Sequence, residues 1–342
     1  MAHDGQEIVS ETAVLPNLLD LTKNAVAPVE ALLATATARV RDMTSRDGRI
    51  SGALLEENQT AAHGVAWLAT YTESLRQMQA WADALVADGA QEAASLAELA
   101  QKSTIVFICA PGSPQVEAIL AEMLPHLNPG SVVVDCSTAD PNSTIALNTK
   151  LEAAGCSMAD APLGGTPVQA HAGALAAMVG ASDETFARIA PVLNTWAGAL
   201  VHLGPVGDGH KMKLLNNFLS MGYAALYAEA LTLAQKSGIS PAQFDSVLRG
   251  SRMDCGFYQT FMGHVTGGDP ESHKFTLTNA AKDMRYLAAM ADAAGMCNPM
   301  GNAVKNSFAG ALSAGLTGPA DFVPHLADHI ARVNGTSLDK PS

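Results

Sequence analysis

Hydrophobic positions in the first quarter of the chain recur with alternating steps of three and four residues. One series comprises Val26, Val29, Leu33, Ala36, Val40 and Met43, and a second comprises Leu68, Tyr71, Leu75, Met78, Ala82 and Leu85. This spacing places the apolar side chains of each series on one face of a helix. Because the polar stretch 45–49 separates the two series, the pattern predicts an antiparallel helical hairpin within residues 1–84.

After residue 85 the pattern changes to short β-rich runs, each followed by a loop and most by a helical segment. The runs cover residues 104–109, 131–136 and 157–160. Such alternation is typical of a parallel sheet with crossover helices, and ligands bind beyond the carboxyl ends of its strands. The small, polar or glycine-containing loops 110–114, 137–138 and 162–166 follow the three runs, so we expect them to meet at one crevice.

Residues 205–335 return to helical patterns, the longest of which cover 212–237, 241–249 and 277–294. Lys213 and Asn217 lie one turn apart near the start of the first pattern, and therefore share a face. An ammonium can donate a proton, and an amide can orient a hydroxyl or carboxylate. Taken alone, a lysine at this place is usually solvated, and so is the Lys282-Asp283 pair on the last helix.

Composition narrows the classes of function for this chain of 342 residues. A net charge of −13 argues against nucleic acid or an anionic membrane as a partner. The five cysteines form no CxxC pair, and the histidines show no metal-ligand spacing, which favours the reduced cytoplasm and no metal site. No apolar run approaches the roughly 18 residues that span a bilayer, and the acidic N-terminus is unlike a signal peptide.

From about Asp83 onward, a series of motifs resembles the β-hydroxyacid dehydrogenases of the 3-hydroxyisobutyrate dehydrogenase type. The series consists of Ala110-Pro-Gly-Ser-Pro114, Asp135-Cys-Ser-Thr138, Asp160-Ala-Pro-Leu-Gly-Gly-Thr166, Gly207-x-Gly-x-x-x-Lys213-x-x-Asn-Asn217 and Lys282-Asp283. The order and spacing of the set are more specific than any one motif. The resemblance implies a Rossmann-like NAD(P)-binding domain over 85–204. It also implies an all-α domain over 205–335, like that of 6-phosphogluconate dehydrogenase, with a long joining helix from near Gly209.

The resemblance also implies roles for individual residues. Lys213 would be the catalytic acid/base, and Asn217 would hold the substrate hydroxyl or carboxylate. Gly164 and Gly165, with Ser137, would donate hydrogen bonds to the carboxylate of a small hydroxy acid.

Four other positions would serve the cofactor, which is NAD or NADP in such enzymes. Ala110, Pro111 and Thr138 would touch its nicotinamide side, and Lys282 would reach toward it from the helical domain. The family further implies a homodimer or homotetramer.

Two departures from the family pattern stand out. The chain contains no GxGxxG, so the first strand–glycine loop–helix unit and its pyrophosphate cradle are missing from the expected fold. This predicts a truncated Rossmann-like parallel sheet in which the 104–109 strand is an exposed edge. In addition, the subfamily with the most similar Asp160–Thr166 stretch often has Arg at the position of Gly165, where it would bind an anionic substrate. The identity of the substrate therefore stays open among branched hydroxy acids, sulfonates and sugar acids.

The segment Glu57–Tyr71 resembles the N-terminal helical part of acyl-CoA dehydrogenases that act on methylsuccinyl-CoA. No active residue of that family carries over. We therefore interpret the chain as a gene fusion joined near residues 78–86. Two hypotheses follow: an NAD(P)-dependent hydroxyacid dehydrogenase, or a catalytically impaired remnant that acts only in folding or oligomerisation.

Overall fold

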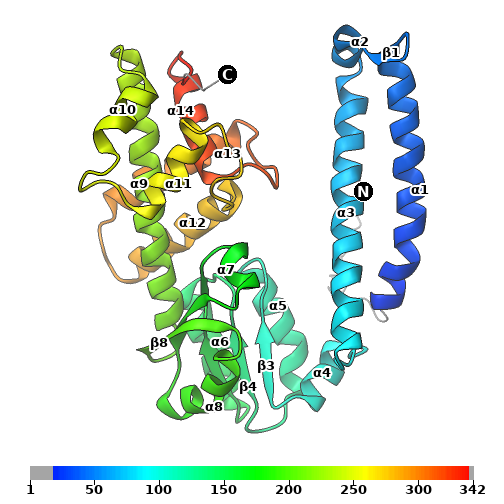
Figure 1. Ribbon diagram of the computed structural model, residues 1–342. Coiled ribbons are helices and arrows are strands. Elements are labelled where there is room, and N and C mark those ends of the chain that lie inside the picture. The colour runs from blue at the N-terminus through cyan, green and yellow to red at the C-terminus, as the bar shows by residue number, and fades with distance from the viewer. Residues whose placement is uncertain (1–17, 339–342) are drawn as a thin grey trace, which may run out of the picture. The chain divides into compact units, whose positions relative to one another are not determined.

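The computed structural model describes residues 18–338, and the chain divides into two compact units between Lys102 and Ser103. The first unit consists of helices and one short ribbon. The second contains a β-sheet with its covering helices and a larger group of helices (Figure 1). Each unit is described by itself below. None of the helices in the described part of the chain combines the length and the apolarity needed to cross a bilayer.

The first unit is a helical hairpin, as the periodicity predicts. Its elements are α1 (Leu18–Thr44), β1 (Ser45–Arg46), β2 (Arg49–Ile50), α2 (Gly52–Glu57), α3 (Gln59–Ala87) and α4 (Leu96–Lys102). The chain reverses at Asp47-Gly48, where both residues have positive φ, as a tight two-residue β-turn requires. An ion pair between Glu30 of α1 and Arg76 of α3, 2.7 Å long, joins the two long helices.

The predicted apolar seam of α3 is wrong in its details. Tyr71, Met78 and Leu85 are exposed, whereas Thr72 and Gln79 are buried. Gln79 accepts a hydrogen bond from Thr22 of α1 at 2.5 Å, so the face of α3 that meets α1 lies one residue further along. The reason is that α3 carries apolar residues on two neighbouring faces, and spacing alone did not distinguish them.

The second unit is built on a six-stranded sheet. Its strands are β3 (Ile105–Ile108), β4 (Val132–Asp135), β5 (Ser157–Asp160), β6 (Leu163–Gly164), β7 (Leu175–Gly180) and β8 (Ala197–Gly204). The order is β3-β4-β5-β7-β6, with β8 also paired to β7. Strands β3, β4 and β5 are parallel and in register from Ile105, Val132 and Ser157, which confirms the three predicted strands.

Strand β7 runs antiparallel to β5, so the sheet is mixed and not wholly parallel as predicted. The connection from β5 to β7 contains only β6 and α7 (Pro167–His171), which is too short for a crossover helix. At the other end of the sheet, β3 pairs with β4 alone among the described strands. The predicted exposed edge is therefore present.

Helices α5 (Ser113–Met123) and α6 (Pro141–Ala153) follow β3 and β4, and α8 (Asp183–Leu193) follows β7. Side-chain caps in the local sequence fix where α6 and α8 begin. Asp140 caps α6 by accepting from the amide of Asn142, and Pro141 occupies the first turn. Ser182 caps α8 through the amide of Thr185. A buried cluster that includes Val132, Val134, Val179 and Ile189 packs between the sheet and α8.

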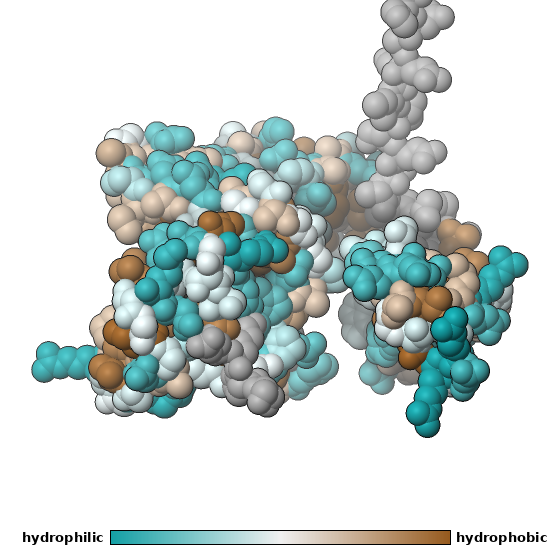
Figure 2. Space-filling model, turned by 90° about the horizontal axis from the view of Figure 1, so that it is seen from above, coloured by the Kyte–Doolittle hydropathy of each residue, from teal (hydrophilic) through white to brown (hydrophobic). Residues whose placement is uncertain are grey.

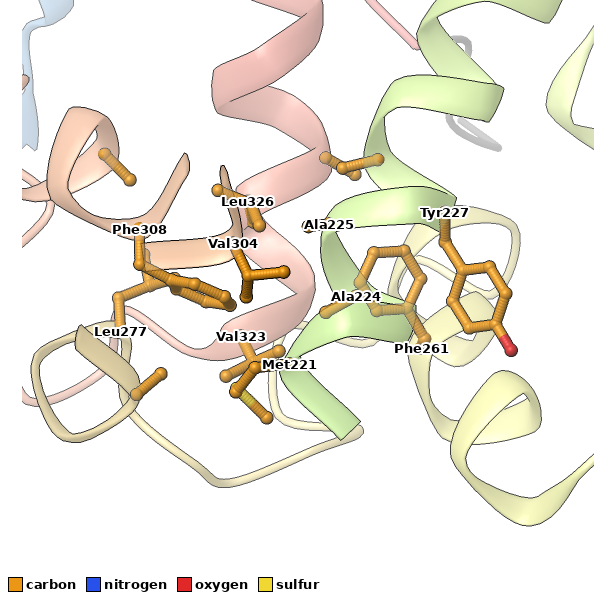
Figure 3. Packing of buried hydrophobic residues seen from close by; sticks show 14 of the residues in the cluster. Met221, Ala224, Ala225, Tyr227, Phe261, Leu277, Val304, Phe308, Val323 and Leu326 are labelled. Carbon is orange, nitrogen blue, oxygen red and sulfur yellow. The ribbon is translucent and has the colours of Figure 1, made fainter. Parts of the chain in front are cut away.

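The remaining helices form an all-α half. They are α9 (Asp208–Lys236), α10 (Pro241–Leu248), α11 (Gly256–Val265), α12 (Leu277–Ala293), α13 (Pro299–Ser313) and α14 (Leu326–Val333), with a 3-10 turn at Val323–His325. Their core gathers around α9, where Met221 and Tyr227 meet residues of α11, α13 and α14 such as Phe261, Phe308 and Leu326 (Figure 3). Helix α9 also runs from this half to the sheet (Figure 1). The three predicted helices are present, and the long joining helix begins at Asp208.

Candidate active site

The start of α9 is fixed against the carboxyl end of β5. Asp160 accepts hydrogen bonds from the amides of Gly207 and His210, both at 2.6 Å, through its two carboxylate oxygens. A carboxylate is stabilised at this position because the N-terminus of a helix carries free N–H groups and partial positive charge. Burial raises the pKa of Asp160, while nearby His210 and these two bonds oppose that rise.

Gly209 allows the helix to approach the sheet closely. A Cβ atom at this position would clash with the carbonyl oxygens of Met178 and Asp160. Only glycine therefore fits between α9 and these two strands. The side chains one turn into the helix, including Lys213, are placed by this contact.

His210 is a buried link between three elements. Its Nδ1 lies 2.8 Å from the Thr144 hydroxyl of α6, and its Nε2 lies 3.1 Å from the carbonyl oxygen of Ser137. His210 and Asp160 were not predicted as site residues. Asp160 could have been found from the sequence, since a carboxylate at the end of a buried strand needs hydrogen-bond donors nearby.

The loops after β3 and β4 meet, as expected of neighbouring parallel strands. The Ser137 hydroxyl accepts a hydrogen bond from the amide of Ala110 at 2.8 Å. Lys282 of α12 donates from Nζ to the carbonyl oxygens of Pro111 at 2.6 Å and Thr138 at 3.1 Å. The structure thus brings together all four residues predicted for the cofactor, along with Ser137.

Lys213 and Asn217 lie on the same side of α9, where both are close to a buried carboxylate. Asp283 of α12 is 1% exposed and accepts a hydrogen bond from the Asn217 amide at 2.6 Å. Its other oxygen lies 3.4 Å from Lys282 Nζ. The solvated-face interpretation of Lys282-Asp283 is therefore wrong, because Asp283 points inward and Lys282 is bonded to two loops.

The pKa values of this group depend on burial and charge. Desolvation lowers the pKa of Lys213, the Asp283 carboxylate opposes that change, and the Lys282 ammonium adds to it. Desolvation raises the pKa of Asp283, against the effects of Lys282, Asn217 and Lys213. Lys213 is thus poised to give up its proton more readily than a solvated lysine.

A cavity of about 250 Å³ lies at this place. Its lining comes from the 164–166 loop, from one face of α9, from the start of α11 and from the segment before α12. The lining residues are Gly164, Gly165, Thr166, Lys213, Asn216, Asn217, Ser220, Met221, Phe257, His273, Lys274 and Phe275. Two lysines and no acidic residue line it, although the protein as a whole carries a net charge of −13. The Lys274 ammonium pairs with Glu271 at 2.7 Å, and the buried Asp283 carboxylate acts on Lys213. The lining of the cavity is thus cationic, with each charge partly balanced from outside the lining.

Four of the five predicted substrate and catalytic residues line this cavity: Gly164, Gly165, Lys213 and Asn217. Ser137 does not. It is 3% exposed, and its oxygen is engaged by the Ala110 amide, so it positions the β3 loop. His273 and Lys274 line the cavity but were not predicted, since the pattern there gave no helix, strand or recognisable motif.

Gly165 has a backbone conformation that favours glycine over a residue with a side chain. Its φ is +127°, a region that residues with side chains rarely adopt, and a Cβ atom would lie 2.9 Å from a methyl group of Leu175. An arginine here would need a different loop. Other residues of the cavity must therefore bind any second anionic group of a ligand.

The described residues fit one end of a nicotinamide dinucleotide better than the other. The Ala110-Pro111 and Ser137-Thr138 loops lie at adjacent strand ends, where such folds place the nicotinamide. Beyond β3, however, the described chain adds no strand to the sheet, and no glycine loop opens a helix there to cradle the pyrophosphate. The nicotinamide end therefore fits, while the pyrophosphate end lacks its usual backbone donors.

Two family sequence models match most of the chain. The NAD binding domain of 6-phosphogluconate dehydrogenase matches residues 66–204, and the NAD-binding domain of NADP-dependent 3-hydroxyisobutyrate dehydrogenase matches residues 207–326. The first match begins inside α3, upstream of the predicted start near Asp83. The division at residues 84 and 204 stays a prediction.

Relatives with known names agree with these matches. The chain is 34% identical over 174 residues to a 2-(hydroxymethyl)glutarate dehydrogenase of Eubacterium barkeri, covering 50% of this chain and 58% of that one. It is 30% identical to a 3-hydroxyisobutyrate dehydrogenase of Pseudomonas aeruginosa, covering 66% and 78%. A solved 3-hydroxyisobutyrate dehydrogenase from Salmonella typhimurium superposes with a TM-score of 0.62 at 27% identity, covering 72% of this chain and 86% of that one.

Proposed function

Because the chain belongs to the 3-hydroxyisobutyrate dehydrogenase family of NAD(P)-dependent dehydrogenases, we propose that it oxidises and reduces a small hydroxy acid with Lys213 as acid/base. The observation that carries the proposal is the shared cavity of Lys213, Asn217, Gly164 and Gly165. The cofactor prediction of NAD or NADP is confirmed at the level of the family. A bound nicotinamide would exchange the hydride.

Proton transfer is the task of Lys213. In the oxidation direction, its neutral amine accepts the hydroxyl proton while the carbon gives up hydride and becomes a carbonyl carbon. In the reverse direction, the ammonium returns that proton to the carbonyl oxygen. Desolvation favours this exchange because it lowers the pKa of Lys213 and so increases the fraction of neutral amine.

The side chain of Asn217 is held in place by the protein itself. One N–H of its amide is held by the buried Asp283 carboxylate, so the second N–H can donate to the substrate hydroxyl or carboxylate. Gly164 and Gly165 line the same cavity and supply backbone atoms with no side chain in the way. Lys282, with Ala110, Pro111 and Thr138, would hold the nicotinamide side of the cofactor.

The proposal is tested by replacing Lys213 with alanine and following nicotinamide absorbance with a panel of small 3-hydroxy acids. Turnover should fall at least a hundredfold, in line with the loss of a general acid/base. Lys211→Ala is the matched control, since Lys211 lies on the same helix but pairs with Asp208 at the surface. Unchanged turnover in Lys213→Ala would remove Lys213 from the mechanism.

The chain spans 58% of the Eubacterium barkeri relative, so its substrate and full activity are proposals. The names of its relatives include glutarate-derived and branched hydroxy acids, and the substrate class is accordingly a small hydroxy acid.

A second candidate function is a folding or oligomerisation module without catalysis. It is favoured by the free edge of β3 and the missing glycine loop.

Location and assembly are also proposals. A reduced cytoplasm suits the unpaired cysteines. A homodimer or homotetramer is supported by α9, which exposes Leu219, Leu226 and Leu233 along one side. Seven-residue steps keep these side chains on one face, where a second copy could pack.

A further inference from the structure

The outer surface of the second unit is mixed in character. Figure 2 shows hydrophobic residues scattered among hydrophilic ones over the face of this unit that is in view. Single exposed hydrophobic residues of this kind are normal on a protein surface and indicate no partner. More specific contacts lie inside the unit, where α12 meets the loops at the end of the sheet.

Helix α5 begins without a side-chain cap of its own, and a tyrosine of α12 takes that role. The N-cap residue is Gly112, which has no side chain to bond the free amides of the first turn. The hydroxyl of Tyr286 on α12 accepts a hydrogen bond from the amide of Ser113, the first residue of α5, at 3.1 Å. A cap from a distant part of the chain thus replaces the local one.

Gly112 leaves the space that this tyrosine occupies. An added Cβ atom would lie 2.6 Å from the Tyr286 hydroxyl oxygen, whereas the next closest atoms, Cδ of Lys282 and Cζ of Tyr286, would lie at 3.4 and 3.6 Å. With a φ of 176°, the backbone of Gly112 is extended, a conformation open to any residue. The hydroxyl of Tyr286, and not backbone strain, therefore excludes a side chain at position 112.

Tyr286 and Lys282 hold the same loop from one face of α12. They are four residues apart, and Lys282 Nζ lies 5.6 Å from the centre of the Tyr286 ring, within the range of a cation–π contact. Lys282 donates to the carbonyl oxygen of Pro111, just before Gly112, and Tyr286 accepts from the amide of Ser113, just after it. The two contacts together fix the loop after β3 on both sides of its glycine.

Ser113 extends this link to the loop after β4. Ser113 is 5% exposed, and its hydroxyl accepts a hydrogen bond from the amide of Asp140 at 2.7 Å. Asp140 caps α6 and lies two positions after Thr138. The hydroxyl of Tyr286 is therefore connected, through Ser113, to both loops that we propose for the nicotinamide side of the cofactor.

The loop after β3 needs such support because β3 lies at the edge of the sheet. Among the described strands β3 pairs with β4 alone, so the sheet holds the carboxyl end of β3 from one side only. The other side of an edge strand presents backbone groups without a strand partner. Helix α12 supplies the contacts that a second neighbouring strand would otherwise give to this loop.

We propose that Tyr286 is a positioning residue for the nicotinamide end of the cofactor, because its hydroxyl fixes the loop after β3. The inference rests on the proposed function, since it assumes that residues 110–111 and Thr138 contact a nicotinamide cofactor. Tyr286 does not line the cavity of Lys213, to which we assign proton transfer. Loss of the hydroxyl should therefore weaken cofactor binding and leave the chemical step nearly unchanged.

The test is Tyr286→Phe in the full chain, which removes the hydroxyl and keeps the ring beside Lys282. The loss of one hydrogen bond of this kind should raise the Kd for NADH and NADPH, measured by nicotinamide fluorescence, roughly threefold to tenfold. The KM for the cofactor should rise in parallel, while kcat stays within about twofold. Tyr223→Phe is the matched control, because Tyr223 is an exposed tyrosine on α9. An unchanged Kd in Tyr286→Phe would overturn the proposal.

A second pair of variants tests the contact between Tyr286 and Gly112. Gly112→Ala should raise the same Kd about tenfold or more, because the methyl group displaces the Tyr286 hydroxyl. In the Tyr286→Phe background the methyl group meets no atom closer than 3.4 Å, so adding Gly112→Ala should change Kd by less than about twofold. If the two effects are instead fully additive, the hydroxyl is not what Gly112 accommodates, and the proposal is wrong.

Hydrogen exchange in the cofactor-free chain separates a failure of this proposal from a failure of the proposed function. The Ser113 amide should exchange roughly three to ten times faster in Tyr286→Phe, since that variant removes its acceptor. An unchanged exchange rate would reject the role of Tyr286 and leave the proposed function intact. Faster exchange in a chain that binds neither NADH nor NADPH would reject the proposed function, and the positioning role with it, while the link from α12 to the loop would stand.

Discussion

At the scale of single residues, the chemistry of the site depends on the buried carboxylate of Asp283. It holds Asn217 at 2.6 Å, contacts Lys282 and acts electrostatically on Lys213. The Lys213–Asn217 pair could be predicted because helical spacing places both on one face. The role of Asp283 could not, because its burial depends on how α12 packs against α9.

Asp283→Asn should shift the pH dependence of oxidation to lower pH. The carboxylate raises the pKa of Lys213, so its removal lets that pKa fall further below its ordinary value of 10.5. Oxidation requires the neutral amine, and its rate therefore rises with pH through this pKa. The profile of kcat/KM against pH is the measurement, and an unshifted rising limb would show that Asp283 does not act on Lys213.

Lys274→Ala should lower the catalytic efficiency for hydroxy acids that carry a second acidic group. Lys274 lines the same cavity as the glycine loop, where Gly165 offers no side chain to a second acidic group, and its ammonium can turn from Glu271, 2.7 Å away, to such a group. We expect kcat/KM for a dicarboxylic hydroxy acid to fall about tenfold, while a hydroxy acid with an uncharged side chain is affected less than twofold. These figures correspond to the loss of one partly exposed charge-assisted contact. Equal losses for both substrates would contradict a role in specificity.

At the scale of elements, the sequence predicted the three parallel strands β3, β4 and β5, the helical hairpin and the helices α9, α10 and α12. The run 131–136 contains three consecutive valines, which are strong β-formers, and helices such as α9 carry a long regular pattern. Strands β6, β7 and β8 were missed, and so was the antiparallel pairing of β7 with β5. The short connection 163–171 gives no sequence signal for the direction of the strand that follows it. The two faces of α3 were confused for a similar reason, since its apolar residues surround much of the helix.

Gly165→Ala should destabilise the second unit by about 1–3 kcal/mol. The φ of +127° is strained for any side chain, and Leu175 leaves no room for a methyl group. Gly222→Ala on α9 is the contrasting change, since its Cβ would lie 4.0 Å from Val304, at ordinary contact distance. It should leave stability unchanged or raise it by up to about 1 kcal/mol. Denaturant unfolding compares the two, and equal stabilities would contradict the strained loop.

At the scale of the whole molecule, the described residues form the cavity proposed for the substrate, but among them no glycine loop cradles the pyrophosphate of a dinucleotide. The absence of GxGxxG was evident from the sequence, and the free edge of β3 confirms its consequence. The similarity of the 57–71 segment to acyl-CoA dehydrogenases, and the gene fusion, remain predictions. The predicted join at 78–86 lies within α3, which is a continuous helix to Ala87.

The lack of a glycine loop for the pyrophosphate should weaken the binding of the cofactor without abolishing it. Each charge-assisted hydrogen bond to the pyrophosphate is worth roughly 1.5–3 kcal/mol, so two such losses reduce affinity on the order of a hundredfold or more. The residues that we propose for the nicotinamide end, 110–111, Thr138 and Lys282, lie together, because Lys282 donates to the carbonyl oxygens of Pro111 and Thr138.

The most direct measurement of the central claim is a titration of the full chain with NADH and with NADPH, followed by nicotinamide fluorescence and by heat. The account predicts saturable binding in the micromolar to millimolar range that Lys282→Ala weakens at least fivefold and Lys305→Ala, a surface change on α13, does not. Absence of binding at millimolar concentrations of both cofactors would contradict the dehydrogenase assignment and leave the chain as an oligomerisation module.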